Sequence, residues 1–240
     1  QISSLYYNSN SPSDNSIVDF EEDNLGNLWI AGFRYGITKY NLKTGQFRQY
    51  KRLSSDSTET YGTPCIYKDN QGTLWIGTAG RGLAKYLPQK DTFQLFYPDP
   101  LKATDGSKRA ENNVTGITED KNDKNILWLS CLDGLYSFNK TTNVFIYHPF
   151  IYPGDKIKNV NYFLCIEQLG NYLYLGTWYE GLVIFDKTTK QFKRIPYTNP
   201  GRDDYHYPIL DLQLLGDSII SMACINDGLL SYHIKTQTIS

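Results

Sequence analysis

The sequence predicts an all-β fold, a β-propeller built of five four-stranded blade repeats. The chain of 240 residues contains 20 Tyr, 11 Phe and 4 Trp but a single Met, a composition that favours pleated strands. An aromatic residue returns after Leu at spacings of 46, 53 and 46 residues, at Trp29, Trp75, Trp128 and Tyr174. Glycines follow each of these positions and extend the series to a fifth repeat, at Gly36, Gly82, Gly134, Gly181 and Gly228.

The first repeat divides into four strands in chain order. Residues 18–22 alternate apolar and polar side chains, and the turn "DNLGN" separates this first strand from a second at 28–32. The loop "FRYG" leads to a third strand at 37–41, and the turn "LKTG" leads to a fourth at 46–50. Four antiparallel strands that repeat about every 46 residues are typical of a propeller blade, whose faces are buried against neighbouring blades.

The later repeats preserve this order. The turn before the fourth strand returns as "LPQKDTF", "NKTTNVF", "DKTTKQF" and "IKTQTI". We therefore expect a single β-propeller domain or fragment over 1–240, with an outer strand at 1–8 and blade repeats at about 15–50, 60–97, 113–147, 161–195 and 208–240. The fifth repeat lacks a Trp, so either Ile220 or Ser221 occupies the position that corresponds to Trp29 of the first repeat.

Two arrangements of the repeats remain open. Both ends of the chain fall at the same point within the repeat, so the first strand could complete the last blade of a closed five-bladed ring. An open arc of a larger propeller would leave apolar blade faces in water, which favours closure. The missing initiator Met instead favours a processed chain or an excerpt.

Composition argues against several classes of function. The formal net charge is −1, so we expect no nucleic-acid partner. The sequence shows neither a signal peptide nor an apolar run long enough to span a bilayer, so no membrane contact is expected from this segment. Four widely spaced cysteines are expected to be small buried apolar residues, at Cys65, Cys131, Cys165 and Cys224.

No catalytic signature is visible in the sequence. The three histidines, His148, His206 and His233, lack the spacing of metal ligands, so we expect no metal, no cofactor and no catalytic residue. The segments "DNLGN" and "KDNQG" share part of a calcium-loop pattern but lack its distant Glu, and we interpret them as hairpin turns.

The string D-x-x-G-x-L-W-I-G-T-x-x-x-G-L, present at 69–83 and in weaker form at 23–37, resembles the two-component regulator propeller repeat. The core "YLYLGTWYEGL" returns at 172–182, and the resemblance extends over all five units. The sequence departs from the pattern at Ser130-Cys131, at Tyr174 and over most of the fifth unit, which puts loop geometry in doubt more than the fold.

Proteins similar to this family are typically the periplasmic sensor portions of hybrid two-component systems, the extracytoplasmic parts of inner-membrane proteins. The resemblance implies a propeller that binds an oligosaccharide or another small ligand and passes the signal to a histidine kinase outside this chain. Other domains of the parent receptor, and a second copy in a homodimer, are the partners it implies. The chain itself is not expected to be an enzyme.

The loops between the second and third strands differ from blade to blade, as "FRYG", "AGRG", "CLDG", "WYEG" and "INDG". Variable tips on a constant scaffold are where binding residues are usually placed. The candidate ligand-binding residues in these tips are Arg34, Tyr35, Arg81, Asp133, Trp178, Tyr179, Glu180, Asn226 and Asp227. A long connection between blades adds Tyr205 and His206 as a wall of the same site.

The tip Trp178-Tyr179-Glu180 is the best candidate for sugar binding, because a flat aromatic ring can cover the C–H face of a sugar while polar groups take its hydroxyls. Alternatively, Trp178 packs under a neighbouring loop. Two other functions remain open. The same face would serve a protein-interaction scaffold, and Asp133, Glu180 and Asp227 would be the carboxylates of a glycoside hydrolase or lyase, although repetition alone explains their equivalent positions.

Overall fold

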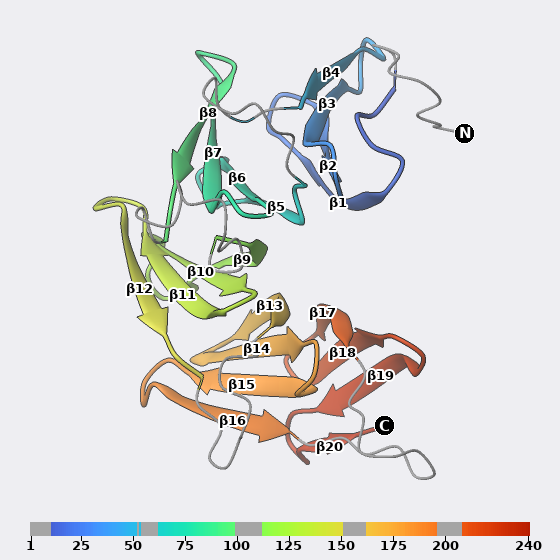
Figure 1. Ribbon diagram of the computed structural model, residues 1–240. Helices are drawn as coiled ribbons and strands as arrows, with labels where there is room; N and C mark the ends of the chain where they lie inside the picture. The colour runs from blue at the N-terminus through green and yellow to red at the C-terminus, as the bar shows by residue number, and fades with distance from the viewer. Residues whose placement is uncertain (1–10, 52, 54–61, 99–111, 151–161, 196–207) are drawn as a thin grey trace. The chain divides into compact units, whose positions relative to one another are not determined.

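The computed structural model describes residues 11–51, 53, 62–98, 112–150, 162–195 and 208–240. Within these ranges the secondary structure is all-β, in five antiparallel four-stranded sheets without a helix (Figure 1). The strands of every sheet are ordered as they follow in the chain, so each sheet is a meander of consecutive hairpins. This topology confirms the predicted β-propeller of four-stranded blades. The outer strand predicted at 1–8 lies outside the described residues.

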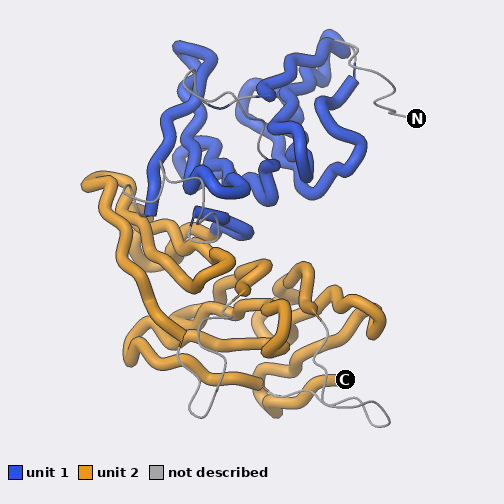
Figure 2. The backbone as a smooth tube through the Cα atoms, in the orientation of Figure 1, with its two compact units in different colours: residues 1–117 blue, residues 118–240 orange. Residues whose placement is uncertain are grey.

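The chain divides into two compact units, residues 1–117 and 118–240 (Figure 2). Unit 1 contains the first two sheets. Sheet 1 consists of β1 (Ile17–Glu22), β2 (Asn27–Gly32), β3 (Ile37–Asn41) and β4 (Phe47–Tyr50). Sheet 2 consists of β5 (Cys65–Lys68), β6 (Leu74–Gly77), β7 (Leu83–Leu87) and β8 (Thr92–Phe96).

Unit 2 contains the other three sheets, and β9 crosses the boundary between the units. Sheet 3 consists of β9 (Val114–Glu119), β10 (Ile126–Cys131), β11 (Gly134–Asn139) and β12 (Val144–His148). Sheet 4 consists of β13 (Phe163–Leu169), β14 (Tyr172–Thr177), β15 (Leu182–Asp186) and β16 (Gln191–Ile195). Sheet 5 consists of β17 (Ile209–Leu215), β18 (Ile219–Cys224), β19 (Gly228–His233) and β20 (Thr238–Ile239).

Within each unit, repeated aromatic residues are packed between successive sheets. Trp29 is fully buried and joins one apolar cluster with Ile76 and Tyr86 of sheet 2, whose ring centroid lies 4.5 Å from that of Trp29. In unit 2, Trp128 packs on Phe185 of sheet 4 at 5.6 Å between centroids. The Leu before each aromatic lies on the opposite face of its strand, since successive side chains of a strand alternate. Sheet 4 illustrates this, with Leu173 in the cluster of Trp128 and Tyr174 in the cluster of sheet 5.

A carboxylate anchors each of the three Trp side chains. Asp23 accepts a hydrogen bond from Nε1 of Trp29 (2.8 Å), Asp69 from Trp75 (2.9 Å) and Asp120 from Trp128 (2.6 Å). The carboxylate of Asp23 also accepts the backbone N–H groups of Leu25 and Asn27, each at 2.9 Å. These bonds satisfy the buried indole and close the hairpin turn at the same time, in agreement with the interpretation of "DNLGN" as a turn.

Strand pairing in the fifth sheet shows which residue occupies the position of the repeated Trp. Ser221 pairs with Gln213 and Ser231, as Trp29 pairs with Glu21 and Lys39 in sheet 1. Ile220 and Met222 face the other way, into the cluster that sheet 5 shares with Tyr174 of sheet 4. Ser221 therefore replaces the aromatic residue, and sheet 5 carries a small polar side chain where the other sheets carry a large ring.

The cysteines agree with the prediction that they are small buried residues. All four are free thiols, three of them buried and Cys224 half-buried. The thiols of Cys65 and Cys165 lie against a glycine near the end of the Trp or Tyr strand of the same sheet, Gly77 and Gly176. A Cβ atom on either glycine would overlap the sulfur, so this close approach explains why the repeat carries Gly there.

His148 makes the stability of unit 2 depend on pH. Its imidazole lies between the rings of Trp128 (5.1 Å) and Phe185 (5.2 Å), and its Nε2 is 3.0 Å from Oγ of Ser137. Burial, with a smaller contribution from the charge of Lys190, lowers the pKa of His148 to about 4. The unfolded chain therefore binds more protons than the folded chain between pH 6.5 and about 4, and stability falls as the pH falls through this range.

We expect His148→Gln to flatten this dependence. The measurement is the urea midpoint of unfolding at pH 7.0 and at pH 5.5, a range that lies above the titration of most carboxylates. The midpoint of the unmodified chain should drop more between these values than that of the variant. Equal drops in both proteins would show that His148 does not contribute.

Candidate functional site

The β2–β3 loop of unit 1 is held from within by polar side chains. The carboxylate of Asp14 accepts the backbone N–H groups of Arg34 (2.6 Å) and Tyr35 (3.2 Å). Thr63, which precedes sheet 2, donates its hydroxyl to the carbonyl of Gly36 (2.9 Å) and accepts the N–H of Gly32 (3.1 Å). The backbone of the loop is thus fixed by buried partners, while its side chains are free to project.

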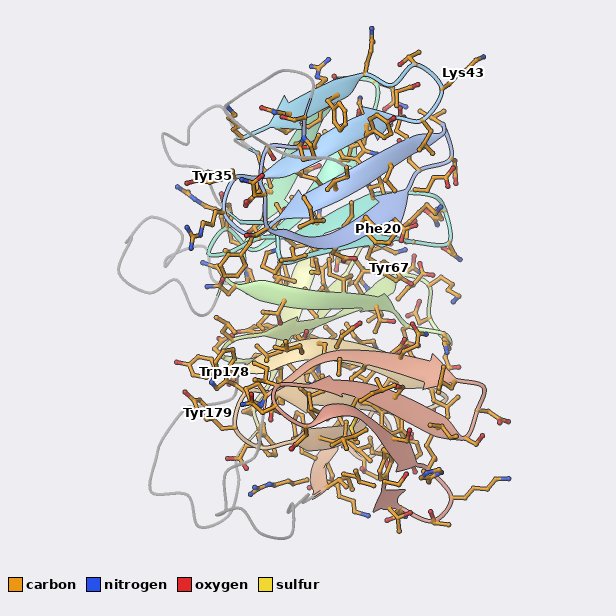
Figure 3. The ribbon with its side chains drawn as sticks, turned by 90° about the vertical axis from the view of Figure 1, so that its right-hand side faces the viewer. Phe20, Tyr35, Lys43, Tyr67, Trp178 and Tyr179 are labelled. Atoms are coloured by element: carbon orange, nitrogen blue, oxygen red, sulfur yellow. The ribbon has the colours of Figure 1, made fainter. Side chains whose placement is uncertain are left out.

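The side chains of this loop are exposed. Phe33 is 58% exposed, Tyr35 is 40% exposed, and Arg34 between them is also exposed. Figure 3 shows Tyr35 at one end of sheet 1 and Lys43, in the β3–β4 turn, at the opposite end. The candidate residues Arg34 and Tyr35 therefore lie on the loop end of the sheet, with Phe33 as a third exposed side chain that sequence reasoning passed over.

The corresponding loop of sheet 2 lies next to it. The carbonyl of Phe33 approaches Cα of Gly62 so closely that a Cβ atom there would overlap it, and the carbonyl of Gly62 accepts the N–H of Ala79 (2.9 Å). Thr78 Oγ1 donates to the carbonyl of Gly82 (2.8 Å) and accepts the N–H of Arg81 (3.0 Å). Unit 1 thus brings together Arg34, Tyr35 and Arg81 on adjacent loops.

The β14–β15 loop of unit 2 repeats this construction. Thr177 Oγ1 donates to the carbonyl of Gly181 (2.9 Å) and accepts the N–H of Glu180 (2.7 Å), as Thr78 does in sheet 2. The N–H of Trp178 donates to the carbonyl of Tyr162, just before β13, at 2.9 Å. A Thr hydroxyl inside the loop therefore lets the residues between Thr and Gly vary without loss of backbone hydrogen bonds.

Three aromatic rings gather at this loop. Trp178 and Tyr179 are 41% and 49% exposed, and their ring centroids lie 6.3 Å apart (Figure 3). The ring of Tyr162 lies 6.0 Å from Tyr179. We call Tyr162, Trp178 and Tyr179 the aromatic shelf. More than half of the Trp178 surface is covered, and the remaining 41% is exposed. Sequence reasoning missed Tyr162, which the hydrogen bond from Trp178 and the ring contact with Tyr179 place at the loop.

Arg194 of β16 fastens the same loop from the outer strand. Its Nη1 lies 2.8 Å from Oε2 of Glu180, and its Nε donates to the backbone carbonyl of Glu180 at 3.2 Å. Both side chains are about one-fifth exposed. Glu180 was expected to take sugar hydroxyls, and in the structure its carboxylate is also one half of an ion pair that positions the shelf.

Asp133 lies in the two-residue turn between β10 and β11. Its Oδ2 accepts the hydroxyl of Tyr136 at 2.6 Å, and its carbonyl accepts the hydroxyl of Tyr147 at 3.0 Å. Burial, followed by the hydrogen bond to Asp133, raises the pKa of Tyr136 far above its usual value, so this hydroxyl stays a donor. Asp133 thus supports two tyrosines of its own sheet, Tyr136 through its carboxylate and Tyr147 through its backbone carbonyl.

Asn226 and Asp227 occupy the β18–β19 loop of sheet 5. Asn226 adopts a left-handed conformation with φ of 67°, which Asn tolerates better than most residues, and is exposed. The N–H of Ile225 donates to the carbonyl of Pro208 at 3.0 Å. Burial, with the charge of Asp227, raises the pKa of Cys224 to about 11, so its thiol stays protonated at neutral pH.

The remaining candidates fall on residues without a described position. Tyr205 and His206 lie outside the described residues. Among the residues that are described, no group of three or more His, Cys, Asp or Glu side chains could hold a metal ion. That same part of the chain has no helix long and apolar enough to cross a membrane.

Comparison with known proteins identifies relatives of the fold. The sequence matches the family described as two component regulator propeller over residues 11–34 and 59–80. No curated protein sequence matches the chain. The structure is similar to the extracellular domain of the hybrid two component system BT3049 from B. thetaiotaomicron, with a TM-score of 0.70 and 21% identity over 95% of this chain and 30% of that chain.

Two further solved structures have the same kind of fold. The extracellular domain of the one component system BT4673 from B. thetaiotaomicron has a TM-score of 0.71 and 18% identity over 99% of this chain and 29% of that chain. The computationally designed Ika8 protein has a TM-score of 0.57 and 14% identity over 93% of this chain and 60% of that chain. The chain spans about 30% of the length of the two bacterial structures, and these low identities show the fold alone.

Proposed function

We propose that this chain, which matches the two component regulator propeller family over residues 11–34 and 59–80, is the ligand-sensing propeller of a larger extracytoplasmic receptor and binds an oligosaccharide. The family match supports a role in two-component signalling. The similar bacterial structures are extracellular domains of signalling systems, which supports a location outside the cytoplasm, in the periplasm. In this proposal the histidine kinase lies in another part of the receptor.

The aromatic shelf is the observation that carries the proposal of an oligosaccharide. Trp178 and Tyr179 remain 41% and 49% exposed on a loop whose backbone is fixed, so a large part of each ring is open to a ligand. A sugar ring has an apolar C–H face that such rings cover, and its hydroxyls can meet the Glu180–Arg194 pair at the rim. Since the loop is already ordered, little conformational entropy is lost when a ligand binds.

Signalling sets a further requirement. A ligand that bound two arrangements of the receptor with equal affinity would not change the equilibrium between them, however tight the binding. We propose that the bound sugar favours one arrangement of the chain with other domains of the receptor, or with a second copy of itself. A rival function, a scaffold that binds protein partners at the same loops, would need no sugar.

Replacing Trp178 by Ala is expected to weaken sugar binding about tenfold or more, since a central aromatic contact typically contributes this much. The measurement is a screen of neutral and acidic oligosaccharides by shift of the melting temperature, followed by calorimetric titration of the best ligand with both proteins. Tyr172→Ala is the matched control, because Tyr172 is a similarly exposed aromatic residue at the opposite end of β14.

The outcomes separate the candidate functions. A ligand that loses affinity with Trp178→Ala but not with Tyr172→Ala supports the shelf. Silence of the whole panel would contradict the proposal and favour the protein scaffold. Release of reducing ends from any oligosaccharide would instead identify a glycoside hydrolase or lyase.

A further inference from the structure

The loop end of unit 1 combines aromatic rings with positive charge. The β2–β3 loop exposes Phe33, Arg34 and Tyr35, and the adjacent loop adds Arg81; we call these four residues the basic tip. Among the described residues, the guanidinium of Arg34 has no hydrogen bond or ion pair. Arg48 and Arg194, by contrast, form ion pairs with Asp91 and Glu180.

Negative charge at this end is turned inward. Asp14 is buried, and its carboxylate accepts the backbone N–H groups of Ser16, Arg34 and Tyr35. The backbone of Lys51, the residue after β4, lies beside Gly36 and brings a third basic residue close to the loop. The β2–β3 loop therefore exposes one cation, Arg34, between two aromatic rings, on a backbone held by Asp14 and Thr63.

We infer that the basic tip is a subsite for the acidic group of a charged sugar, either a carboxylate or a sulfate ester. A guanidinium offers a planar fork of donors that matches both groups, and bonds of this kind are roughly twice as strong as neutral ones. Phe33 and Tyr35 on either side of Arg34 would contact the apolar face of the same sugar ring. This inference rests on the proposed function, since it names the class of oligosaccharide for unit 1.

The two units differ in this respect. In unit 2 the arginine beside the aromatic shelf is already paired with Glu180, so its charge is neutralised. In unit 1 the guanidinium of Arg34, between the exposed rings of Phe33 and Tyr35, has no hydrogen bond or ion pair with another described residue. An acidic sugar therefore has a reason to prefer the basic tip, whereas the aromatic shelf does not discriminate by charge.

The test uses the full chain and two pairs of probes. One pair is oligogalacturonide with free and with methyl-esterified carboxyl groups, and the other is carrageenan oligosaccharide before and after desulfation. Calorimetric titrations are carried out at 20 mM and 300 mM NaCl on the unmodified chain, on Arg34→Gln and on Lys43→Gln. Lys43 is the matched control, because it is an exposed basic residue at the opposite end of sheet 1 (Figure 3).

We expect one acidic probe to bind, with affinity that falls with salt because exposed charges are screened. Arg34→Gln should weaken that binding about tenfold, whereas Lys43→Gln should leave it unchanged. Equal affinity for the acidic probe and its neutral form, equal losses in the two variants, or no binding of either acidic probe would overturn the inference. If only a neutral sugar binds, and its binding depends on Trp178, the proposed oligosaccharide-binding function stands and the acidic subsite at the basic tip is wrong. If no sugar of any kind binds, the proposed function and the acidic subsite are both wrong.

Discussion

Replacing Trp29 by Ala is expected to lower the free energy of unfolding by about 3–5 kcal/mol, the usual cost of removing a large buried ring. Trp29 is fully buried and contacts Tyr50, Tyr86 and Phe93 at centroid distances of 5.5, 4.5 and 6.1 Å. The ammonium of Lys39 lies 5.4 Å from its ring centroid. The substitution would also leave the carboxylate of Asp23 without its indole partner.

The measurement is urea unfolding followed by circular dichroism. Trp178→Ala is the control, since this residue is of the same type and half-exposed. It should change the free energy of unfolding by well under about 1 kcal/mol, as surface substitutions usually do. Similar losses for the two variants would contradict the division of the Trp residues into core and site.

Replacing Asp120 by Ala is the second substitution with a large expected effect, about 3–5 kcal/mol, because it would leave a buried lysine unpaired. Asp120 and Lys187 are only 9% and 8% exposed, and the two charged atoms lie 2.7 Å apart. The same carboxylate accepts Nε1 of Trp128 and the backbone N–H of Asn122. One carboxylate thus joins the β9–β10 turn of sheet 3 to the β15–β16 turn of sheet 4.

The double variant Asp120→Ala/Lys187→Met provides the control. Removing both charges should recover part of the stability that Asp120→Ala loses, since no unpaired charge then remains in the interior. Unfolding of both variants and of Lys187→Met alone in urea gives the coupling between the two residues. Additive losses would show that the pair does not act as a unit.

The contribution of Asp120 to the free energy of unfolding is expected to decrease at low pH. Burial alone would raise its pKa, but the hydrogen bonds from Lys187 and Trp128 outweigh burial and hold the pKa below its usual range. The stabilisation is therefore complete above the unfolded-state pKa of about 3.9 and is lost as the pH falls through the lowered folded-state value.

The strands could be predicted because two periods in the sequence determine them. The return of Leu-Trp about every 46 residues fixes the second strand of each sheet, and alternation of apolar and polar residues fixes its neighbours. In sheet 1 the predicted strand limits agree with the structure to within one residue. In the degenerate fifth repeat no aromatic residue marks this position. Only the pairing of Gln213 with Ser221 in the structure identifies Ser221 as the residue that replaces Trp.

The site could be predicted only as far as its loops. The contrast between constant cores and variable tips indicates where Arg34 and Trp178 lie, but it does not reveal their contacts. Arg194 meets Glu180 because β15 and β16 pair in one particular register, and that register depends on the turn between them. Tyr162 reaches the shelf through a backbone hydrogen bond that no side-chain pattern records.

The repeated Asp–Trp bond also escaped the sequence reasoning. The aspartates of "DNLGN" and "KDNQG" were recognised as turn residues, since Asp commonly accepts backbone N–H groups nearby. Their bonds to the indoles of Trp29 and Trp75 span six residues and need both strands of the hairpin in place. Local turn chemistry predicts that these aspartates accept backbone N–H groups, but it does not predict that they also accept the indole N–H of Trp29 and Trp75.

Hydrogen exchange of the chain with and without its best oligosaccharide tests the central claim most directly, that the variable loops between the second and third strands bind the ligand. The account predicts that protection on binding concentrates in these loops, at 33–36, 78–82 or 178–181. Protection confined to the turns at the opposite ends of the sheets, such as 42–45 and 187–190, would contradict it.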